Sequence, residues 1–155
     1  MADEDNGEGK YVFVTENGET KNMSRGYTGK ATANYPNKDC YEGDFLDGIR
    51  EGRGQYLYFA TADKYDGEWK TNRKHGIGKM HYNKKGVYQG YWENGKRHGE
   101  GVFTYPNGDV YSGWWKFGEK EGTGRYTSSN MTLYGTWKNG QIVEGTWTYP
   151  NGVYY

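Results

Sequence analysis

The chain has very little of what usually forms a globular core. Of its 155 residues only 13 are isoleucine, leucine or valine, and five phenylalanines add little to them. So low an aliphatic content is typical of disordered chains. Disordered chains, however, are poor in aromatic residues and rich in charge of one sign. Here 28 residues are phenylalanine, tyrosine or tryptophan, and the formal net charge is zero. The sequence therefore predicts one continuous ordered domain with an aromatic core.

Other absences limit the class of protein. Cys40 is the single cysteine of the sequence, so no internal disulfide can form, and its place before Tyr41 indicates a small filler. No stretch has the character of a signal peptide or a membrane span, and we therefore predict a cytoplasmic protein. The 26 glycines recur at regular spacing and no segment keeps a period of about 3.6 residues, so helices are not expected.

What the chain does contain is a sequence motif, here called the repeat phrase, that recurs every 22 to 24 residues. It reads Tyr-x-Gly-x-Trp/Phe, a short gap, Gly-x-Gly, an aromatic residue and a turn. The copies begin at Tyr41, Tyr65, Tyr88, Tyr111 and, with leucine in the tyrosine slot, Leu133. A short fixed period of this kind indicates an array of similar structural units.

The alternation of side chains between the two faces of a strand shows how the repeat phrase can be placed on strands. Tyr65, Gly67 and Trp69 share one face of a predicted strand, because strand side chains alternate between two faces. Glycine leaves room for a ring from a neighbouring strand to lie over its backbone. Glu68 and similar residues face the other way and are charged or polar. The pattern predicts an all-β fold, an elongated single-layer antiparallel sheet of stacked hairpins with one aromatic and one polar face.

Both ends depart from the repeat. Residues 1–28 are predicted to be a degenerate N-terminal capping unit, in which Lys21 to Arg25 replace the Tyr-x-Gly-x-Trp phrase. Acidic residues precede that unit: Asp3, Glu4 and Asp5. Residues 29–155 are predicted to be the array, beginning and ending in partial units. Tyr155 falls in the tyrosine slot of a further unit, so the last strand would present an open edge. Such an edge indicates a piece of a longer array or an end that docks on another molecule, and it would allow homodimerisation.

The repeat phrase, followed by Asn-Gly before the next tyrosine, resembles the MORN repeat (membrane occupation and recognition nexus) from Gly29 to Tyr155. The resemblance implies an elongated single-layer β-array with rings stacked along a groove. It also implies a role as a scaffold in cilia and other cytoskeletal structures, in membrane-contact proteins, or as an appendage of lipid kinases. The runs HGEGVFTYPNGDVYSGWW and GDFLDGIREGRGQYLY resemble the radial-spoke-head members of the family.

The sequence does not predict a catalytic, cofactor or metal site. A nucleotide-binding glycine loop needs a third glycine three residues after Gly-x-Gly, where this chain has Leu57, His81, Thr104 and Thr127. His75 and His98 occupy one slot in successive repeats, which places them about 10 Å apart. A shared metal ion, with bonds of about 2 Å, could not bridge them. We therefore predict a protein that is not an enzyme, with no cofactor and no metal.

Several residues break the pattern of the polar face. The slot before the last aromatic residue of the first strand is, in successive units, Asp44, Glu68, Tyr91, Trp114 and Thr136. Tyr91 and Trp114 are thus predicted to lie next to each other on the polar face, which Leu57 and Val102 share. Phe117 takes a linker position that is polar elsewhere. Because exposed aromatic residues form binding hot spots, we predict that Tyr91, Trp114, Phe117 and Leu57 contact a partner protein. The alternative is that a neighbouring segment covers them.

Basic residues recur between the two strands of each unit and would line up along one edge. Five of them form the predicted lipid-binding set: Lys70, Arg73, Lys74, Lys96 and Arg97. A basic stripe attracts anionic lipid with about 1 kcal/mol per charge near the membrane surface. Acidic residues such as Glu93 lie among them, which equally fits a mixed, soluble edge. A net charge of zero does not favour nucleic acid as a partner.

These observations predict a non-enzymatic scaffold that binds and positions proteins of a cytoskeletal or ciliary assembly. The alternative is a peripheral membrane module that binds phosphoinositides through the basic edge. A third interpretation is an array excised from a larger enzyme. A scaffold should bind protein regardless of lipid, whereas binding through the basic edge should fall steeply as salt rises.

Overall fold

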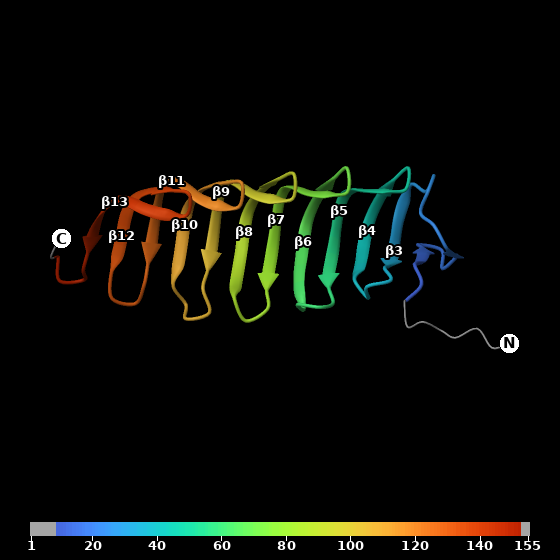
Figure 1. The fold of residues 1–155 in the computed structure, drawn as a ribbon, viewed down its shortest axis with the longest axis horizontal. Helices are drawn as coiled ribbons and strands as arrows, with labels where there is room; N and C mark the ends of the chain where they lie inside the picture. Colours follow the sequence, from blue (N-terminus) through green and yellow to red (C-terminus); the bar gives the residue numbers. More distant parts are fainter. Residues whose placement is uncertain (1–8, 153–155) are drawn as a thin grey trace.

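The computed structural model describes residues 9–152, which form one antiparallel sheet of 13 strands without a helix (Figure 1). The strands follow one another across the sheet in chain order from β13 to β3, and β1 and β2 complete the other edge. The predicted all-β, single-layer fold is confirmed. The acidic residues of the predicted cap and Tyr155 lie outside the described residues.

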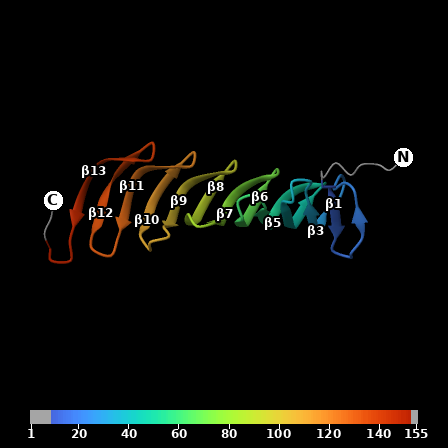
Figure 2. The same ribbon diagram turned by 60° about the horizontal axis from the view of Figure 1, so that its bottom comes forward.

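The strands are short and regular. Their bounds are β1 Val12–Thr15, β2 Thr20–Lys21, β3 Gly29–Asn34, β4 Cys40–Leu46, β5 Ile49–Tyr58, β6 Asp63–Lys70, β7 Arg73–Tyr82, β8 Gly86–Glu93, β9 Lys96–Thr104, β10 Val110–Lys116, β11 Glu119–Thr127, β12 Thr132–Lys138 and β13 Gln141–Thr148. From β4 onward each repeat supplies one hairpin, with Tyr-x-Gly-x-Trp/Phe in its first strand (Leu133 replaces the tyrosine in the last) and, in all but the last, Gly-x-Gly in its second. Figures 1 and 2 show the hairpins side by side in an elongated, twisted row, with β1 and β13 at opposite ends.

A row of glycines crosses the sheet. Cross-strand pairing aligns one glycine from every strand between β4 and β13: Gly43, Gly54, Gly67, Gly78, Gly90, Gly101, Gly113, Gly124, Gly135 and Gly145. A buried tyrosine ring covers each glycine of this row from Gly43 to Gly124. A Cβ atom added to Gly78 would lie 2.2 Å from the hydroxyl of Tyr65. The prediction that these glycines make room for rings is confirmed.

The aromatic face forms the core. Tyr65 is fully buried, and its ring packs edge-on against Trp69 of its own strand and Trp92 of the next hairpin, with centroids 5.3 Å away in both cases. Its hydroxyl donates to the Glu68 carbonyl oxygen at 2.9 Å. The Trp92 indole Nε1 donates to the Gly78 carbonyl oxygen at 3.1 Å. Edge-to-face pairs contribute about 0.5–1.5 kcal/mol each beyond burial, so rings that repeat along the array can replace the missing aliphatic core.

Each of the first four complete hairpins carries a bulge in its second strand, just before the second glycine of Gly-x-Gly. In the second of these hairpins Gly67 pairs with Gly78 and Trp69 with Lys74, so three residues of β7, 75–77, lie opposite Glu68 alone. Within this bulge, Gly76 has a positive φ of 57°, a conformation that glycine adopts without strain. Bulges bend strands, and Figure 1 shows each hairpin curving near its upper turn. Glu68 and its counterparts point to the polar face by ordinary strand alternation, and the bulged residues lie opposite them.

Candidate functional site

The polar face is hollowed along the glycine row. Side chains on either side of that row form two walls, and the glycine backbone forms the floor. We call this hollow the glycine groove. It has a stretch over β1 and β3–β6 and another over β7–β12. The two stretches have different chemistry because the residues beside the glycines differ from repeat to repeat.

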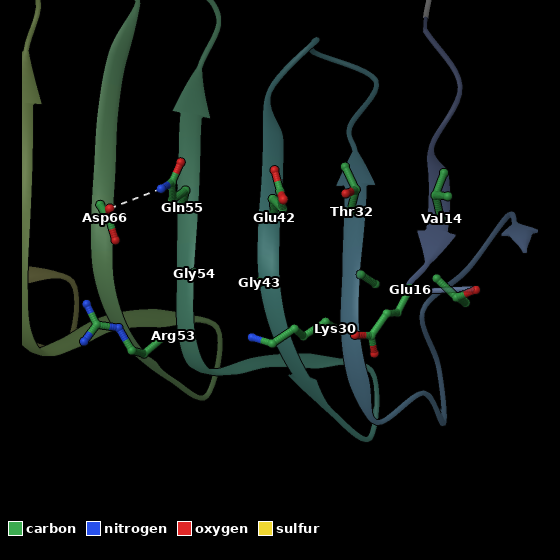
Figure 3. A pocket seen from close by; sticks show the side chains of 12 residues that line it. Val14, Glu16, Lys30, Thr32, Glu42, Gly43, Arg53, Gly54, Gln55 and Asp66 are labelled. Atoms are coloured by element: carbon green, nitrogen blue, oxygen red, sulfur yellow. Dashed lines mark hydrogen bonds between the residues drawn. The ribbon is translucent and has the colours of Figure 1, made fainter. Parts of the chain in front are cut away.

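The stretch over β1 and β3–β6 is mainly polar and has a volume of about 570 Å³. Figure 3 shows Glu42, Gln55 and Asp66 in one row across the strands, with Lys30 and Arg53 on the other side of the glycines. The Gln55 side chain donates to the Asp66 carboxylate at 3.1 Å. The groove is therefore lined here by side chains that solvate well and that also hydrogen bond with one another.

The stretch over β7–β12 is mainly apolar, although Glu100 and Arg125 also line it, and it has a volume of about 660 Å³; we call it the apolar stretch. Its walls contain five exposed apolar side chains: Ile77, Tyr91, Val102, Trp114 and Tyr134. Tyr91 and Trp114 are each 49% exposed, and Tyr134 is 52% exposed. Large apolar surface that stays in contact with water over several neighbouring strands marks a binding surface more often than chance.

The position of Glu68 on β6, opposite the bulge, shows what the exposed aromatic residues replace in the later hairpins; we call it the bulge slot. The Asp44 carboxylate accepts the backbone N–H of Arg53 at 2.9 Å, and the Glu68 carboxylate accepts that of Ile77 at 2.7 Å. The first of these bonds, together with the Lys30 ammonium, holds the pKa of Asp44 below its usual range. Tyr91 and Trp114 occupy the same slot in the next two hairpins and give up this carboxylate bond. A hydrogen bond to a charged group contributes about 1.5–3 kcal/mol, so the exposed rings replace a stabilising residue.

The structure brings some of the predicted partner-binding residues together and separates others. Tyr91 and Trp114 share the apolar stretch, as predicted. Phe117 lies in the turn between β10 and β11, 6.3 Å from the His98 ring, and does not line the stretch. Leu57 is exposed on β5, near the end of that strand, and does not line it either. Their predicted role in binding is thus separate from the apolar stretch.

Sequence reasoning missed two residues of the apolar stretch, Ile77 and Tyr134. Both carried a readable signal. Ile77 lies between the glycines of Gly-x-Gly, where the preceding and following complete repeats have Arg53 and Glu100. Tyr134 precedes the glycine of its first strand, where Glu42, Asp66, Gln89 and Ser112 stand in the other units. An apolar residue in a slot that is otherwise polar was the signal in each case.

The predicted edge of five basic residues requires a correction. Lys70, Arg73 and Lys96 are exposed near the hairpin turns, but Lys74 and Arg97 turn to the aromatic face. Each of these two directly follows an exposed basic residue on the same strand, and successive strand side chains point to opposite faces. The Lys74 Nζ lies 4.6 Å from the Trp92 ring centroid, and the Arg97 Cζ lies 4.4 Å from that of Trp115. A contribution of the three exposed residues to lipid binding stays a prediction.

Burial, together with the neighbouring Arg97 guanidinium, lowers the pKa of Lys74 to about 8. Asp63 acts in the opposite direction without offsetting the other two. Because the folded chain releases this proton more readily than the unfolded chain, the unfolded state binds more protons between about pH 8 and pH 10. Stability contributed by this site therefore rises with pH across that window.

We expect the Lys74→Met variant, which keeps the apolar stem, to be more stable than the natural chain at pH 7 by a margin that shrinks toward pH 9.5. Urea unfolding at several pH values measures the margin. Lys70→Met, at an exposed position of the same hairpin, controls for the loss of one positive charge. A margin that is constant with pH would contradict the lowered pKa.

No group of three or more histidine, cysteine, aspartate or glutamate side chains in residues 9–152 is arranged to hold a metal ion. His81 is exposed on the polar face. His98 has a carboxylate neighbour that the sequence did not reveal. Its Nε2 lies 3.3 Å from the Glu93 carboxylate. Within the described part of the chain there is also no helix long and apolar enough to cross a membrane.

Comparison with known proteins adds three findings. The family model of the MORN repeat matches residues 41–59, 65–87, 88–110, 111–130 and 134–154. No curated protein matches the sequence significantly. Among solved structures, the TCP domain of Drosophila melanogaster SAS-4 in complex with a proline-rich motif of Ana2 has a similar fold, with a TM-score of 0.51. It is 16% identical and covers 81% of this chain and 69% of its own.

A second structure, the TCP10c domain of Drosophila melanogaster Sas-4, is 20% identical and has a TM-score of 0.45 over 82% of this chain and 90% of its own. The five family matches together span more than half of the chain and coincide with the hairpins from β4 to β13. The chain belongs to the MORN-repeat family.

Proposed function

We propose that this chain is a non-enzymatic scaffold that binds an extended segment of a partner protein in the apolar stretch of the glycine groove. One observation carries the proposal. Tyr91, Trp114 and Tyr134 stand exposed on neighbouring hairpins, over a floor of glycine backbone that a ligand main chain can approach closely. Aromatic side chains of this kind supply most of the binding energy at protein interfaces.

The residues in the bulge slot also support binding of a partner. Asp44 and Glu68 show that a carboxylate in this slot bonds the backbone of the opposite strand. Two successive hairpins have an exposed ring there instead, at the expense of that bond. The gain from binding a partner accounts for such a replacement, whereas folding alone favours the carboxylate.

The similar fold of the SAS-4 TCP domain, which was solved with a proline-rich motif of another protein, supports a proposal for the class of partner. We propose a proline-rich segment for this chain as well, and a cytoskeletal or ciliary assembly as its setting. Proline-rich segments are extended and already ordered, and they dock on grooves lined with aromatic rings. The proposed scaffold binds its partner and catalyses no reaction.

The test is selection of proline-rich 15-residue peptides from a display library on the immobilised chain. The selected peptides are then synthesised, and their affinities measured by fluorescence polarisation. We expect Trp114→Ala to weaken binding by about tenfold or more, as for a hot-spot residue. Phe59→Ala, an exposed ring outside the apolar stretch, is the matched control and should leave affinity within about twofold. Phe117→Ala shows whether the site extends to the β10–β11 turn.

Enrichment of no sequence, or affinities that do not respond to Trp114→Ala, would contradict the proposal. Anionic vesicles are the second probe in the same assay. Vesicle binding would favour the membrane alternative if Trp114→Ala leaves it intact and the double change Lys70→Glu with Arg73→Glu removes it. The attraction of exposed basic residues to an anionic membrane depends on charge and salt and not on the aromatic residues.

A further inference from the structure

Four cations form a ladder on the aromatic face. They occupy the second position of strands β5, β7, β9 and β11: Arg50, Lys74, Arg97 and Lys120. Each lies over rings of two adjacent hairpins, with the nearest ring centroid 4.4–4.6 Å away. We call them the cation ladder. Its members are half-buried, so their charged groups are held in place by the rings and remain partly open to solvent.

A row of half-buried tyrosines runs beside the cation ladder. Lys74 lies 5.5 Å from the Tyr58 ring, Arg97 lies 5.9 Å from Tyr82, and Lys120 lies 5.3 Å from Tyr105. A hollow of about 270 Å³ opens between two rungs of the ladder. Its lining includes Arg97, Lys120, Phe103, Tyr105 and Trp115. Charge and exposed ring surface thus alternate along this face.

The charge of the cation ladder is not balanced within the described residues. None of its four members lies within 4.0 Å of a carboxylate in residues 9–152. The nearby acids are otherwise placed. Asp39 and Asp109 accept the hydroxyls of Tyr56 and Tyr126, Asp63 accepts the backbone N–H of Asn83, and Glu119 lines the hollow without an ion pair. Four like charges in a partly dry setting favour an anionic ligand.

The hydrogen bonds of the ladder lead to the same conclusion. Arg50 donates to the Asn72 carbonyl oxygen, Arg97 to that of Gly118, and Lys120 to the Tyr105 hydroxyl. Among the described residues no acceptor is placed for the Lys74 ammonium, which contacts rings alone. The Lys74 ammonium is partly open to solvent, so a ligand oxygen can bond to it directly, and Arg50 Nε is buried without an acceptor among the described residues.

The spacing of the ladder selects the form of the ligand. Successive rungs lie on alternate strands, about two strand spacings or 9–10 Å apart. A polyproline II helix advances about 3.1 Å per residue and has three residues per turn, so every third side chain points the same way at intervals of about 9.3 Å. A β-strand ligand would send every third side chain to alternating sides. The spacing therefore fits the polyproline II conformation and not the extended strand.

We propose that the cation ladder binds a proline-rich protein segment that carries aspartate or glutamate at every third position. The carboxylates would meet the four cations, and the intervening prolines would pack on the row of half-buried tyrosines. This site is on the face opposite the glycine groove. It goes beyond the proposed function and does not depend on it.

The test uses two synthetic 12-residue peptides with the full chain. One is (Glu-Pro-Pro)₄, and the other places the same four glutamates together ahead of eight prolines. Charge and composition are equal, and the arrangement of the acids along the chain differs. We expect (Glu-Pro-Pro)₄ to bind about tenfold more tightly, with an affinity that falls as salt rises. Equal affinities, or no binding of (Glu-Pro-Pro)₄ at millimolar concentration, would overturn the proposal.

Matched variants locate the binding. Lys74→Met and Lys120→Met keep the stem on the rings and remove a ladder charge, and each should weaken (Glu-Pro-Pro)₄ by about five- to tenfold. Lys70→Met and Lys116→Met remove one exposed charge from the same hairpins and should change affinity by less than about twofold. Losses of equal size in both pairs would indicate unspecific attraction and refute the ladder.

A measurement on the natural chain covers variants that fail to fold. In NMR spectra, (Glu-Pro-Pro)₄ should shift the indole N–H signals of Trp69, Trp92 and Trp115, which contact the ladder, and leave that of Trp114 in place. The reverse pattern would place the peptide in the glycine groove and overturn the proposal. Trp114→Ala separates the two sites, since it should weaken binding at the groove by about tenfold or more and leave this one intact.

Discussion

Replacing Trp115 by alanine is expected to lower the free energy of unfolding by about 4 kcal/mol, the cost of removing a large aromatic side chain from a core. Trp115 is 4% exposed. Its ring packs edge-on against Tyr88 and Tyr111, with centroids 5.2 and 5.3 Å away, and lies beneath the Arg97 guanidinium. Its Nε1 donates to the Gly101 carbonyl oxygen at 3.2 Å. Alanine would lose all of these contacts and leave a cavity between two hairpins.

The adjacent residue is the control. Trp114 is the same residue type on the same strand, but it points to the other face and is 49% exposed. Trp114→Ala should therefore cost less than about 1 kcal/mol, in the range of exposed substitutions. Urea unfolding followed by circular dichroism compares the two variants without relying on tryptophan fluorescence. Similar losses for both would mean that the two faces are assigned wrongly.

Replacing Gly78 by alanine is expected to destabilise the chain by about 3 kcal/mol or more, although only one methyl group is added. The new Cβ would lie 2.2 Å from the Tyr65 hydroxyl and 2.5 Å from its Cζ. Tyr65 cannot yield, because it is fully buried between Trp69 and Trp92 and its hydroxyl is bonded to the backbone. The backbone of Gly78 lies outside the left-handed region, so the effect is steric and not conformational.

Gly95→Ala separates the two causes. Gly95 lies in a turn with φ +83°, and a Cβ there would meet no atom within 4 Å. That variant should cost only the left-handed backbone, about 1–2 kcal/mol. In addition, Tyr65→Val combined with Gly78→Ala should cost clearly less than the sum of the single changes, because residues in contact are not additive. Additive losses would show that the ring and the glycine do not compete for the same space.

Because each hairpin contacts only its neighbours, both core changes should act locally. Stability in a stacked array is approximately a sum over units and the interfaces between them. Hydrogen exchange should accordingly show the loss of protection for Gly78→Ala centred on β6, β7 and β8. Loss of protection spread evenly over the described strands would mean that the array unfolds as one cooperative unit.

Much of the fold could be predicted from the sequence. Tyr65, Gly67 and Trp69 recur in register with their counterparts, and strand alternation places all three on one face whatever the neighbours are. The same alternation placed Tyr91 and Trp114 on the opposite face, where the structure has them. Local rules were sufficient for these assignments because each involves a single strand and its own period of two.

What required the tertiary structure was every contact that depends on pairing register and on the bend of the hairpins. The sequence did not indicate that Ile77 and Tyr134 join Tyr91 and Trp114, because they come from four different strands whose alignment sets the groove wall. It also did not reveal that Lys74 and Arg97 leave the exposed edge, although strand alternation allowed it. Their place is decided by rings of their own hairpin together with the tryptophan of the next hairpin, which lies nearest to each cation.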